Sequence, residues 1–311
     1  MSRFRLLDLP EKATKNVLSI MDLIDIFWLS CCSKRSKSIA TAFHLKAEET
    51  VLTITNSIIL RVPIIDWGTL KFNLYLSSGV VEVQNEDVET RRWKDDTKRM
   101  REWILHIFDV FHCRGIQSLN FEARSQRIEV MDLERSLEGI QLKALRLQQR
   151  FPIDHRHRIV KYFSRANSLF LREDSCEDID SFRRLLVQNY DIHQNSQADF
   201  SSLTLDDLLL SNASHLELEG VTFTDKDFNR FLRCWQRGVT SVRCNLVVLV
   251  LAEIRRFREA IIFKGTNRQV VTVDDEERVF EIRREEDNVL ARITLDDEGN
   301  GFIFSVRDEV E

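Results

Sequence analysis

Few residues in this chain have the type and spacing that chemistry requires. His155 and His157 lie two positions apart just after Pro152, and side chains at that spacing share a face only on a strand. Flanking arginines disfavour a cation there, so we interpret the stretch as a solvated loop. The cysteines at positions 31, 32, 113, 176, 234 and 244 match no zinc-ligand spacing. We therefore expect neither a metal nor an organic cofactor.

Motifs for phosphate binding and nucleophilic catalysis are absent from the sequence. The nine glycines are scattered and form neither a P-loop nor a dinucleotide-binding motif, and no Gly-x-Ser-x-Gly occurs. Neighbouring acids such as Asp206 and Asp207 are common at helix starts, whereas catalytic carboxylates must converge in space. We predict that the chain is not an enzyme and has no catalytic residues.

The composition is that of a folded globular protein. Hydrophobic residues make up 43% and charged residues 31% of the 311 positions. The longest apolar run, Leu246 to Ala252, is far shorter than the roughly 18 residues that a membrane span needs. The irregular cysteine spacing indicates reduced thiols. We expect a cytoplasmic or nuclear protein with no membrane partner.

Charge is distributed unevenly along the chain. Residues 91–165 carry 17 Lys/Arg against 10 Asp/Glu, and residues 274–311 carry 5 against 14. Such asymmetry indicates either a charged partner, including nucleic acid, or solvated faces of elements whose apolar sides are buried. A pI near 5.9, interspersed acids and the lack of a nucleic-acid-binding motif favour solvated faces.

The apolar stretch 4–43 predicts three short helices that must be positioned by something larger. Leu9-Pro10 is a favourable helix start, Asp22 is a good N-cap for a second helix, and Ser33 opens a third. The second helix is apolar on more than one side, and about 40 residues cannot bury that surface among themselves. The stretch is therefore either a docking surface for a partner or a cap on a larger domain.

This stretch resembles an F-box. The Leu-Pro opening, the Val-Leu-x-x-Met step, the Leu-x-x-Ile-x-x-Leu-Ser run and the trailing Cys-Ser-Lys-Arg occur at that family's spacing, while Ala13 replaces a larger apolar residue. The resemblance implies that residues 1–45 bind the adaptor protein of cullin–RING ubiquitin ligases and that residues 46–311 bind a protein substrate. The implied adaptor contacts are Leu9, Pro10, Val17, Leu18, Met21, Leu23, Leu29 and Ser30.

The chain after the F-box-like stretch predicts strands and then a long helix. Residues 50–80 are rich in β-branched residues and alternate with the strand period of two. Apolar residues from Trp93 to Phe111 fall on one helical stripe, which predicts the longest helix over residues 86–113. Gly115 is suited to a left-handed position at its end.

A weak repeat begins at residue 116. Short strands with the spacing apolar-x-x-apolar-x-apolar start at Ile116, Leu142, Ala166 and Ala213, at intervals of 26, 24 and 47 residues, the last close to two units. Helical stretches precede the later strands, as in leucine-rich repeats, although the consensus Asn is missing. The alternative is an unrelated α/β domain whose strands begin in the same way.

Residues 205–235 resemble the type 2 F-box-associated domain, which follows the F-box in a large nematode-type family. The matching pieces are Leu-Asp-Asp-Leu-Leu, Asn-Ala-x-x-Leu-x-Leu and Thr-Asp-x-Asp-Phe-Asn-Arg-Phe-Leu-x-x-Trp, and the segment 279–295 matches the family's closing hairpin. The run 239–251 departs from the family pattern. Thr224 predicts a helix N-cap, and the stripe that ends at Trp235 predicts a buried face.

The predicted fold class is α/β. An N-terminal three-helix F-box is followed by a degenerate leucine-rich-repeat-like α/β solenoid. From Val270 onward, four strands separated by turns predict an antiparallel β cap at the C-terminal end.

Side-chain alternation identifies outward positions on the predicted repeat strands. In each strand the two apolar residues point inward, so the residue between them points outward. If the repeats stack, these positions line the surface that such folds use for binding. The predicted substrate contacts are Asn120, Arg146, Phe170 and Glu217.

Together these features predict a non-catalytic substrate receptor of an SCF-type cullin–RING ubiquitin ligase. Its expected partners are the ligase adaptor and a protein substrate. One alternative is a protein-interaction scaffold whose partners are not degraded. The other is a nucleic-acid-binding protein that uses the basic region 91–165.

Overall fold

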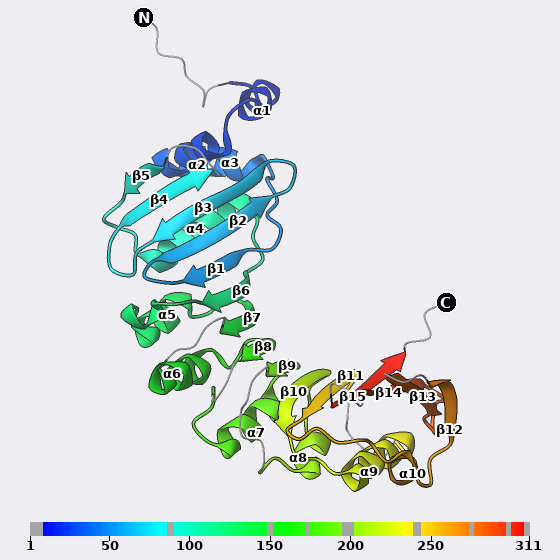
Figure 1. Ribbon diagram of the computed structural model, residues 1–311. Helices are drawn as coiled ribbons and strands as arrows, with labels where there is room; N and C mark the ends of the chain where they lie inside the picture. Colours follow the sequence, from blue (N-terminus) through cyan, green and yellow to red (C-terminus); the bar gives the residue numbers. More distant parts are fainter. Residues whose placement is uncertain are drawn as a thin grey trace, which may run out of the picture. The chain divides into compact units, whose positions relative to one another are not determined.

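The computed structural model describes residues 9–85, 90–147, 152–171, 175–194, 202–238, 244–273, 277–296 and 300–307. The chain divides into two compact units, residues 1–144 and 145–311 (Figure 1). The expected boundary between residues 45 and 46 stays a prediction. No helix in the described part of the chain is long and apolar enough to cross a membrane.

The first unit combines short helices with an antiparallel sheet. Its elements in chain order are α1 (Glu11–Leu18), α2 (Leu23–Cys32), α3 (Lys34–Ala42), β1 (Val51–Ile54), β2 (Ile58–Ile64), β3 (Gly68–Leu74), β4 (Val80–Asn85), β5 (Arg91–Lys94), α4 (Met100–Phe111), β6 (Ile116–Phe121), a 3-10 turn (Ser125–Arg127) and α5 (Val130–Leu137). Strands β1 to β5 pair antiparallel in sequence, and β6 pairs parallel with β1. Strand β7 (Leu142–Leu147) spans the boundary between the units.

Helix α2 packs into the core of the first unit. The ring centroid of Phe27 lies 5.0 Å from that of Phe72 on β3 and 6.3 Å from that of Phe111 on α4. All three rings are buried. A helix that is apolar on several sides needs burial on several sides. The sheet and α4 supply that burial, so α2 belongs to the same core as β3.

The prediction of one helix over residues 86–113 is wrong. Residues 91–94 form strand β5, and the helix begins only at Met100. A turn separates the two elements, in which the Thr97 N–H donates to Oδ1 of Asp95 at 3.0 Å. Trp93 continues the helical period but stacks on Trp28 of α2 instead, with ring centroids 5.3 Å apart.

The end of helix α4 also differs from the prediction. The residue in the left-handed conformation is His112, with φ 51°, directly after the helix. Gly115 has φ 147°, and a Cβ atom there would lie 2.7 Å from the carbonyl oxygen of Gln141. Gly115 is therefore required for a close backbone approach rather than for the helix end.

The second unit alternates helices with parallel strands. Its first elements are α6 (Ile153–Phe163), β8 (Ser168–Leu171), α7 (Ile179–Gln188), β9 (Asp191–Gln194), α8 (Leu205–Leu209), β10 (His215–Val221), α9 (Asp225–Gln236) and β11 (Leu246–Leu251). Strands β8 to β11 are parallel neighbours, and α7, α8 and α9 lie on one side of them in Figure 1. The buried residues Leu169, Ile192 and Leu216 occupy equivalent positions on β8, β9 and β10.

Strand β9 explains the interval of 47 residues in the sequence repeat. It lies between β8 and β10, where the long interval left room for one more strand and helix. Asn189, just before β9, donates through Nδ2 to the carbonyls of Ser164 and Ala166, both at 2.7 Å. These bonds tie one strand–helix step to the preceding one. Whether the steps form a leucine-rich-repeat-like solenoid stays a prediction.

The C-terminal strands form an antiparallel sheet. After α10 (Glu259–Ile262), the strands are β12 (Arg268–Val273), β13 (Glu277–Arg283), β14 (Leu290–Asp296) and β15 (Gly301–Arg307). Each pairs antiparallel with the next, and β15 pairs antiparallel with β11. The sheet thus continues the parallel strands at their C-terminal edge. Residues 239–243, inside the run that departs from the family pattern, lie outside the described residues.

Helix α9 packs as its apolar stripe predicts. Thr224 caps it, accepting from the Asp227 N–H and donating its own N–H to the Asp227 carboxylate. Phe228 stacks on Phe302 of β15 with ring centroids 4.3 Å apart. The Trp235 side chain is 1% exposed and meets Phe304 edge-on, with centroids 5.2 Å apart.

We expect Trp235→Ala to lower the free energy of unfolding by about 3–5 kcal/mol, because it leaves a cavity beside β15. Trp235→Phe is the matched control and should cost less, since Nε1 has no hydrogen-bond partner among the described residues. Urea unfolding of the two variants measures both values. A Trp235→Ala protein of unchanged stability that loses a partner would identify Trp235 as a binding residue instead.

Candidate functional site

The eight predicted adaptor contacts differ in burial. Leu18, Leu23 and Ser30 are at most 2% exposed, so in this structure they support the helices from within. Pro10 is exposed at the N-cap position of α1. The half-buried members of the set are Leu9, Val17, Met21 and Leu29. The exposed and half-buried residues are the ones placed to meet a partner, and their contact with an adaptor stays a prediction.

Ser30 is held inside the first unit by His106 of α4. Its Oγ donates to the Phe27 carbonyl at 2.6 Å and lies 2.8 Å from Nε2 of His106. Because the serine proton is used, Nε2–H is the donor between the two side chains. Burial, followed by the charges of Lys98 and Lys37, lowers the pKa of His106 from 6.5 to about 4. The imidazole is neutral at pH 7 and joins α2 to α4.

The stability of the protein should therefore depend on pH through His106. The folded-state pKa lies below the unfolded value, so the unfolded state binds the proton more readily between pH 6.5 and about 4. The contribution of neutral His106 is fully present above pH 6.5 and is lost as the pH falls towards 4. We expect the melting temperature to fall less steeply over this range in His106→Gln than in the natural protein. Equal slopes for the two proteins would contradict the assignment.

Sequence reasoning missed the most exposed apolar residue of this region. Ile20 is 83% exposed and lies in the turn between α1 and α2. Helical periodicity selects Val17, Leu18 and Met21, but α1 ends at Leu18, so the period no longer applies. A large apolar residue beside Val17 and Met21 in sequence extends the surface that a partner can bury.

Three of the four predicted substrate contacts, Arg146, Phe170 and Glu217, lie in one row across the strands of the second unit. Phe170 of β8 pairs in register with His193 of β9, which pairs with Glu217 of β10. Arg146 of β7 places its guanidinium carbon 3.5 Å from the centroid of the Phe170 ring. We call this row of four side chains the outward ladder; it consists of Arg146, Phe170, His193 and Glu217. Asn120 belongs to the first unit, where its half-buried side chain accepts a hydrogen bond from Ser118 at 2.6 Å.

The outward ladder runs continuously from a cation to a carboxylate. The rings of Phe170 and His193 are parallel within 1°, with centroids 4.4 Å apart. Nδ1 of His193 lies 3.0 Å from Oε2 of Glu217. Since Arg146 and His193 come from the strands on either side of β8, they cover the two faces of the Phe170 ring. The Phe170 side chain is half-buried.

His193 was absent from the predicted contacts because its strand was not recognised. The sequence around β9 reads Tyr-Asp-Ile-His-Gln and lacks the Leu-x-Leu pattern of its neighbours. The only signal was the long repeat interval, which indicated one more unit without locating its strand. Within that strand, alternation about the buried Ile192 would have placed His193 outward.

A second polar row lies beside the outward ladder on the same strands. Asp191 of β9 accepts from Ser168 Oγ at 2.7 Å, and its other oxygen lies 2.9 Å from Nδ1 of His215 on β10. Asp191 and Glu217 are thus each paired with a neighbouring strand. These cross-strand pairs hold the side chains of this face in fixed positions.

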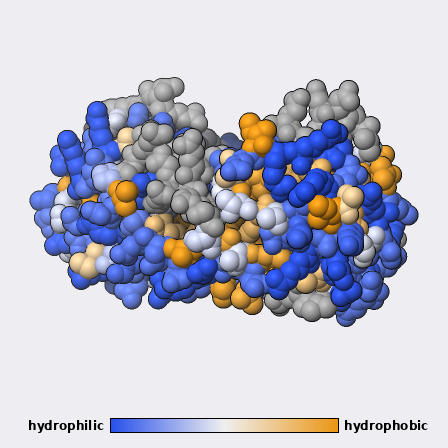
Figure 2. Space-filling view, turned by 60° about the horizontal axis from the view of Figure 1, so that its bottom comes forward, coloured by the Kyte–Doolittle hydropathy of each residue, from blue (hydrophilic) through white to orange (hydrophobic). Residues whose placement is uncertain are grey.

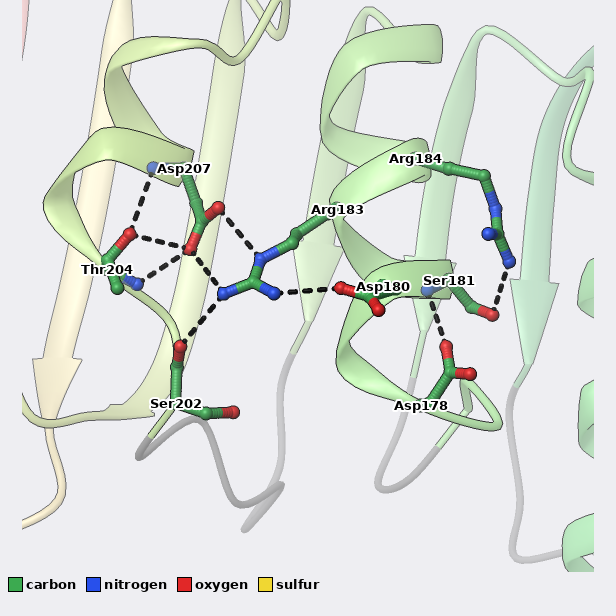
Figure 3. Close-up of polar contacts among 8 residues, drawn as sticks. All are labelled: Asp178, Asp180, Ser181, Arg183, Arg184, Ser202, Thr204 and Asp207. Carbon is green, nitrogen blue, oxygen red and sulfur yellow. Dashed lines mark hydrogen bonds and ion pairs between the residues drawn. The ribbon is translucent and has the colours of Figure 1, made fainter.

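The helix side of the second unit contains a different polar network, shown in Figure 3. Arg183 of α7 donates through Nε to Asp207 at the start of α8 at 2.8 Å, and through Nη1 to Asp180 at 2.8 Å. Asp207 also closes a capping box with Thr204. Burial raises the pKa of the Asp207 carboxyl, but the hydrogen bonds from Arg183 and Thr204 lower it further, so that the pKa lies below its usual value. The network positions α8 on α7, so it is structural.

No metal-ion site is found among the described residues. They contain no group of three or more His, Cys, Asp or Glu side chains that could hold a metal ion. Burial raises the pKa of Cys31 to about 11 and that of Cys176 to about 12, so these thiols stay protonated. His155 and His157 lie in α6 and not in a loop, because Pro152 starts a helix there; His155 is buried.

Exposed hydrophobic residues are spread over the second unit. Large exposed side chains occur on separate elements, as with Val187 on α7, Leu210 after α8 and Ile254 after β11. On the face drawn in Figure 2, hydrophilic residues predominate and hydrophobic residues form patches among them. Single exposed side chains such as Val187, Leu210 and Ile254 need no functional explanation. The ordered polar ladder is the more specific candidate for partner binding.

The described residues therefore present two candidate surfaces, the exposed part of α1–α2 and the outward ladder. Comparison with protein families gives two matches, an F-box domain over residues 6–48 and an F-box associated domain over residues 181–241. No curated protein and no solved structure matches the chain. The chain is an F-box protein that carries an F-box-associated domain.

This combination indicates, in general terms, a substrate-receptor role in SCF-type ubiquitin ligases. An F-box implies binding to the adaptor of cullin–RING ligases, and both kinds of module are typically non-catalytic. The F-box match covers α1, α2 and α3, and the second match begins within α7 and extends past the end of α9. Two members of the outward ladder, His193 and Glu217, lie within that second match.

Proposed function

We propose that this F-box protein binds its adaptor through the α1–α2 region and a protein substrate through the outward face of β8, β9 and β10. The observation that carries the proposal is the F-box match at residues 6–48, on helices that share a core with the sheet of the first unit. A receptor acts by proximity, because holding substrate and ligase together raises the effective concentration of the reacting groups. No catalytic residue is needed for this role.

The adaptor surface in this proposal consists of the accessible apolar residues of the F-box. Its centre is Ile20, flanked by Val17 and Met21, with Pro10 at the start of α1. Leu9 and Leu29 contribute their exposed parts. Leu18, Leu23 and Ser30 act from inside by fixing the helices, although the motif marks all of these positions alike.

Substitutions at Ile20 and Leu18 should separate binding from folding. Ile20→Asp places a charge on an exposed contact and should weaken adaptor binding at least tenfold, about 1.4 kcal/mol, without lowering stability. Leu18→Ala removes a buried side chain and should cost about 2–5 kcal/mol of stability. Titration calorimetry with the purified adaptor and thermal unfolding measure the two effects. Leu210→Asp alters an exposed leucine of the second unit and serves as control; full affinity in a folded Ile20→Asp protein would refute this surface.

The substrate surface is proposed on the ladder because its side chains are ordered and partly accessible. Arg146 and Phe170 are half-buried, and the side chains of His193 and Glu217 are 27% and 40% exposed. Aromatic residues and arginine are enriched where binding energy concentrates in interfaces. Asn120, on β6 of the first unit, remains a proposed contact of the same kind.

The combined variant Phe170→Ala, Arg146→Glu tests whether this face binds substrate. We expect it to retain the adaptor and to lose proteins that co-purify with the natural chain when cullin activity is blocked. Quantitative mass spectrometry of both purifications measures the loss. Those proteins should also turn over more slowly after the receptor is depleted. Unchanged turnover would favour a scaffold, and unchanged co-purification would move the substrate surface elsewhere.

The basic region 91–165 gives little support to nucleic-acid binding. Several of its cations are paired with carboxylates of the same unit, including Arg91 with Asp25 and Lys98 with Asp95. Phosphate binding would have to break such pairs before counterion release could contribute. We therefore assign the charges of this region to solvated faces of the two units.

A further inference from the structure

The outward ladder ends in a cation, Arg146, that pairs with no carboxylate among the described residues. Its guanidinium lies over the ring of Phe170. Two carboxylates on the same face of the neighbouring strands have partners of their own. Glu217 pairs with His193, and Asp191 with Ser168 and His215.

Stacking leaves the hydrogen-bonding capacity of Arg146 intact. A guanidinium that lies on an aromatic face interacts through its plane, while its five N–H donors point outward from its edge. The stack also restricts the rotamers of a long side chain, so less entropy is lost when a ligand binds. Phe170 is itself held by His193, and His193 by Glu217.

The shape of this donor group selects its ligand. A planar fork of N–H donors fits two oxygens of one carboxylate or phosphoryl group, and lysine cannot reproduce this geometry. An apolar side chain would gain little, because both faces of the Phe170 ring are covered. The arrangement is therefore built for an oxyanion at the end of the ladder.

We propose that Arg146 is the specificity-determining contact for an oxyanion on the substrate, the carboxylate of an acidic residue or the phosphoryl group of a phosphorylated one. This inference rests on the substrate-receptor function proposed above. Phe170 and His193 are positioning residues that hold the guanidinium flat. Glu217 fixes His193 from the far end of the ladder.

Binding to a positional-scanning peptide library tests the proposal. The full chain in complex with its adaptor is presented with sub-libraries in which one position is Asp, Glu, phosphoserine, Asn or Lys and the others are randomised. We expect the acidic or phosphoserine sub-libraries to bind at least tenfold more than the Asn sub-library. A further preference for phosphoserine over Asp and Glu identifies the phosphoryl group, and its absence identifies the carboxylate.

Conservative variants separate orientation from charge. Arg146→Lys retains the charge but loses the planar fork, and Phe170→Leu retains apolar bulk but removes the stacking surface. Both should weaken the preference for oxyanions, because the paired donors are lost or no longer held flat. Arg165→Lys, an exposed arginine after α6, is the matched control and should preserve it. If Phe170→Leu does not fold, Arg146→Gln supplies the second test, since its half-buried side chain lies at the end of the ladder.

Two outcomes overturn the inference. One is the absence of any preference for oxyanions in the natural protein, and the other is a preference that is undiminished in a folded Arg146→Lys chain. Adaptor binding is measured on the same samples. If the adaptor binds while the oxyanion preference is missing, only this inference fails; if the natural chain does not bind the adaptor, the receptor function itself fails.

Discussion

The packing of Phe27 against Phe72 and Phe111 is the interaction on which the first unit depends. It places an F-box helix, a strand and a later helix around one aromatic core. Without that core, the second helix of the F-box would leave a large apolar surface in water. The bond between Ser30 and His106 and the stacking of Trp28 on Trp93 reinforce the same contact. The F-box of this chain is therefore one layer of a larger unit.

Local signals predicted most elements whose pattern is carried by their own residues. The stripe of α9, its cap at Thr224 and the four C-terminal strands follow from periodicity and turn residues, and the structure contains them. The break before α4 was missed because Trp93 happens to continue the helical period. Its actual neighbour, Trp28, is distant in sequence. No local pattern distinguishes an aromatic residue that packs across a sheet edge from one on a helix.

The candidate surfaces could be predicted only in part, because they too depend on contacts between residues that are distant in sequence. Alternation about buried leucines identified Arg146, Phe170 and Glu217 as outward residues, and in the structure they lie in one row. The stacking order within that row depends on strand register, which the sequence does not specify. In the F-box, the motif identifies which residues match the family but does not predict which of them are buried. It therefore grouped buried Leu18 with accessible Met21 and omitted Ile20, which is 83% exposed.

The shared core of α2, β3 and α4 has a consequence for the lifetime of the protein. A ligand that binds only the folded state adds to the free energy of unfolding, by about 2.7 kcal/mol when its concentration is 100 times its Kd. An adaptor bound to the F-box would raise the free energy of unfolding of every element that unfolds together with Phe27. The strands of the first unit would thus be protected by a partner that they do not touch. The supply of adaptor, rather than the sequence alone, would then set how long the folded receptor survives in the cell.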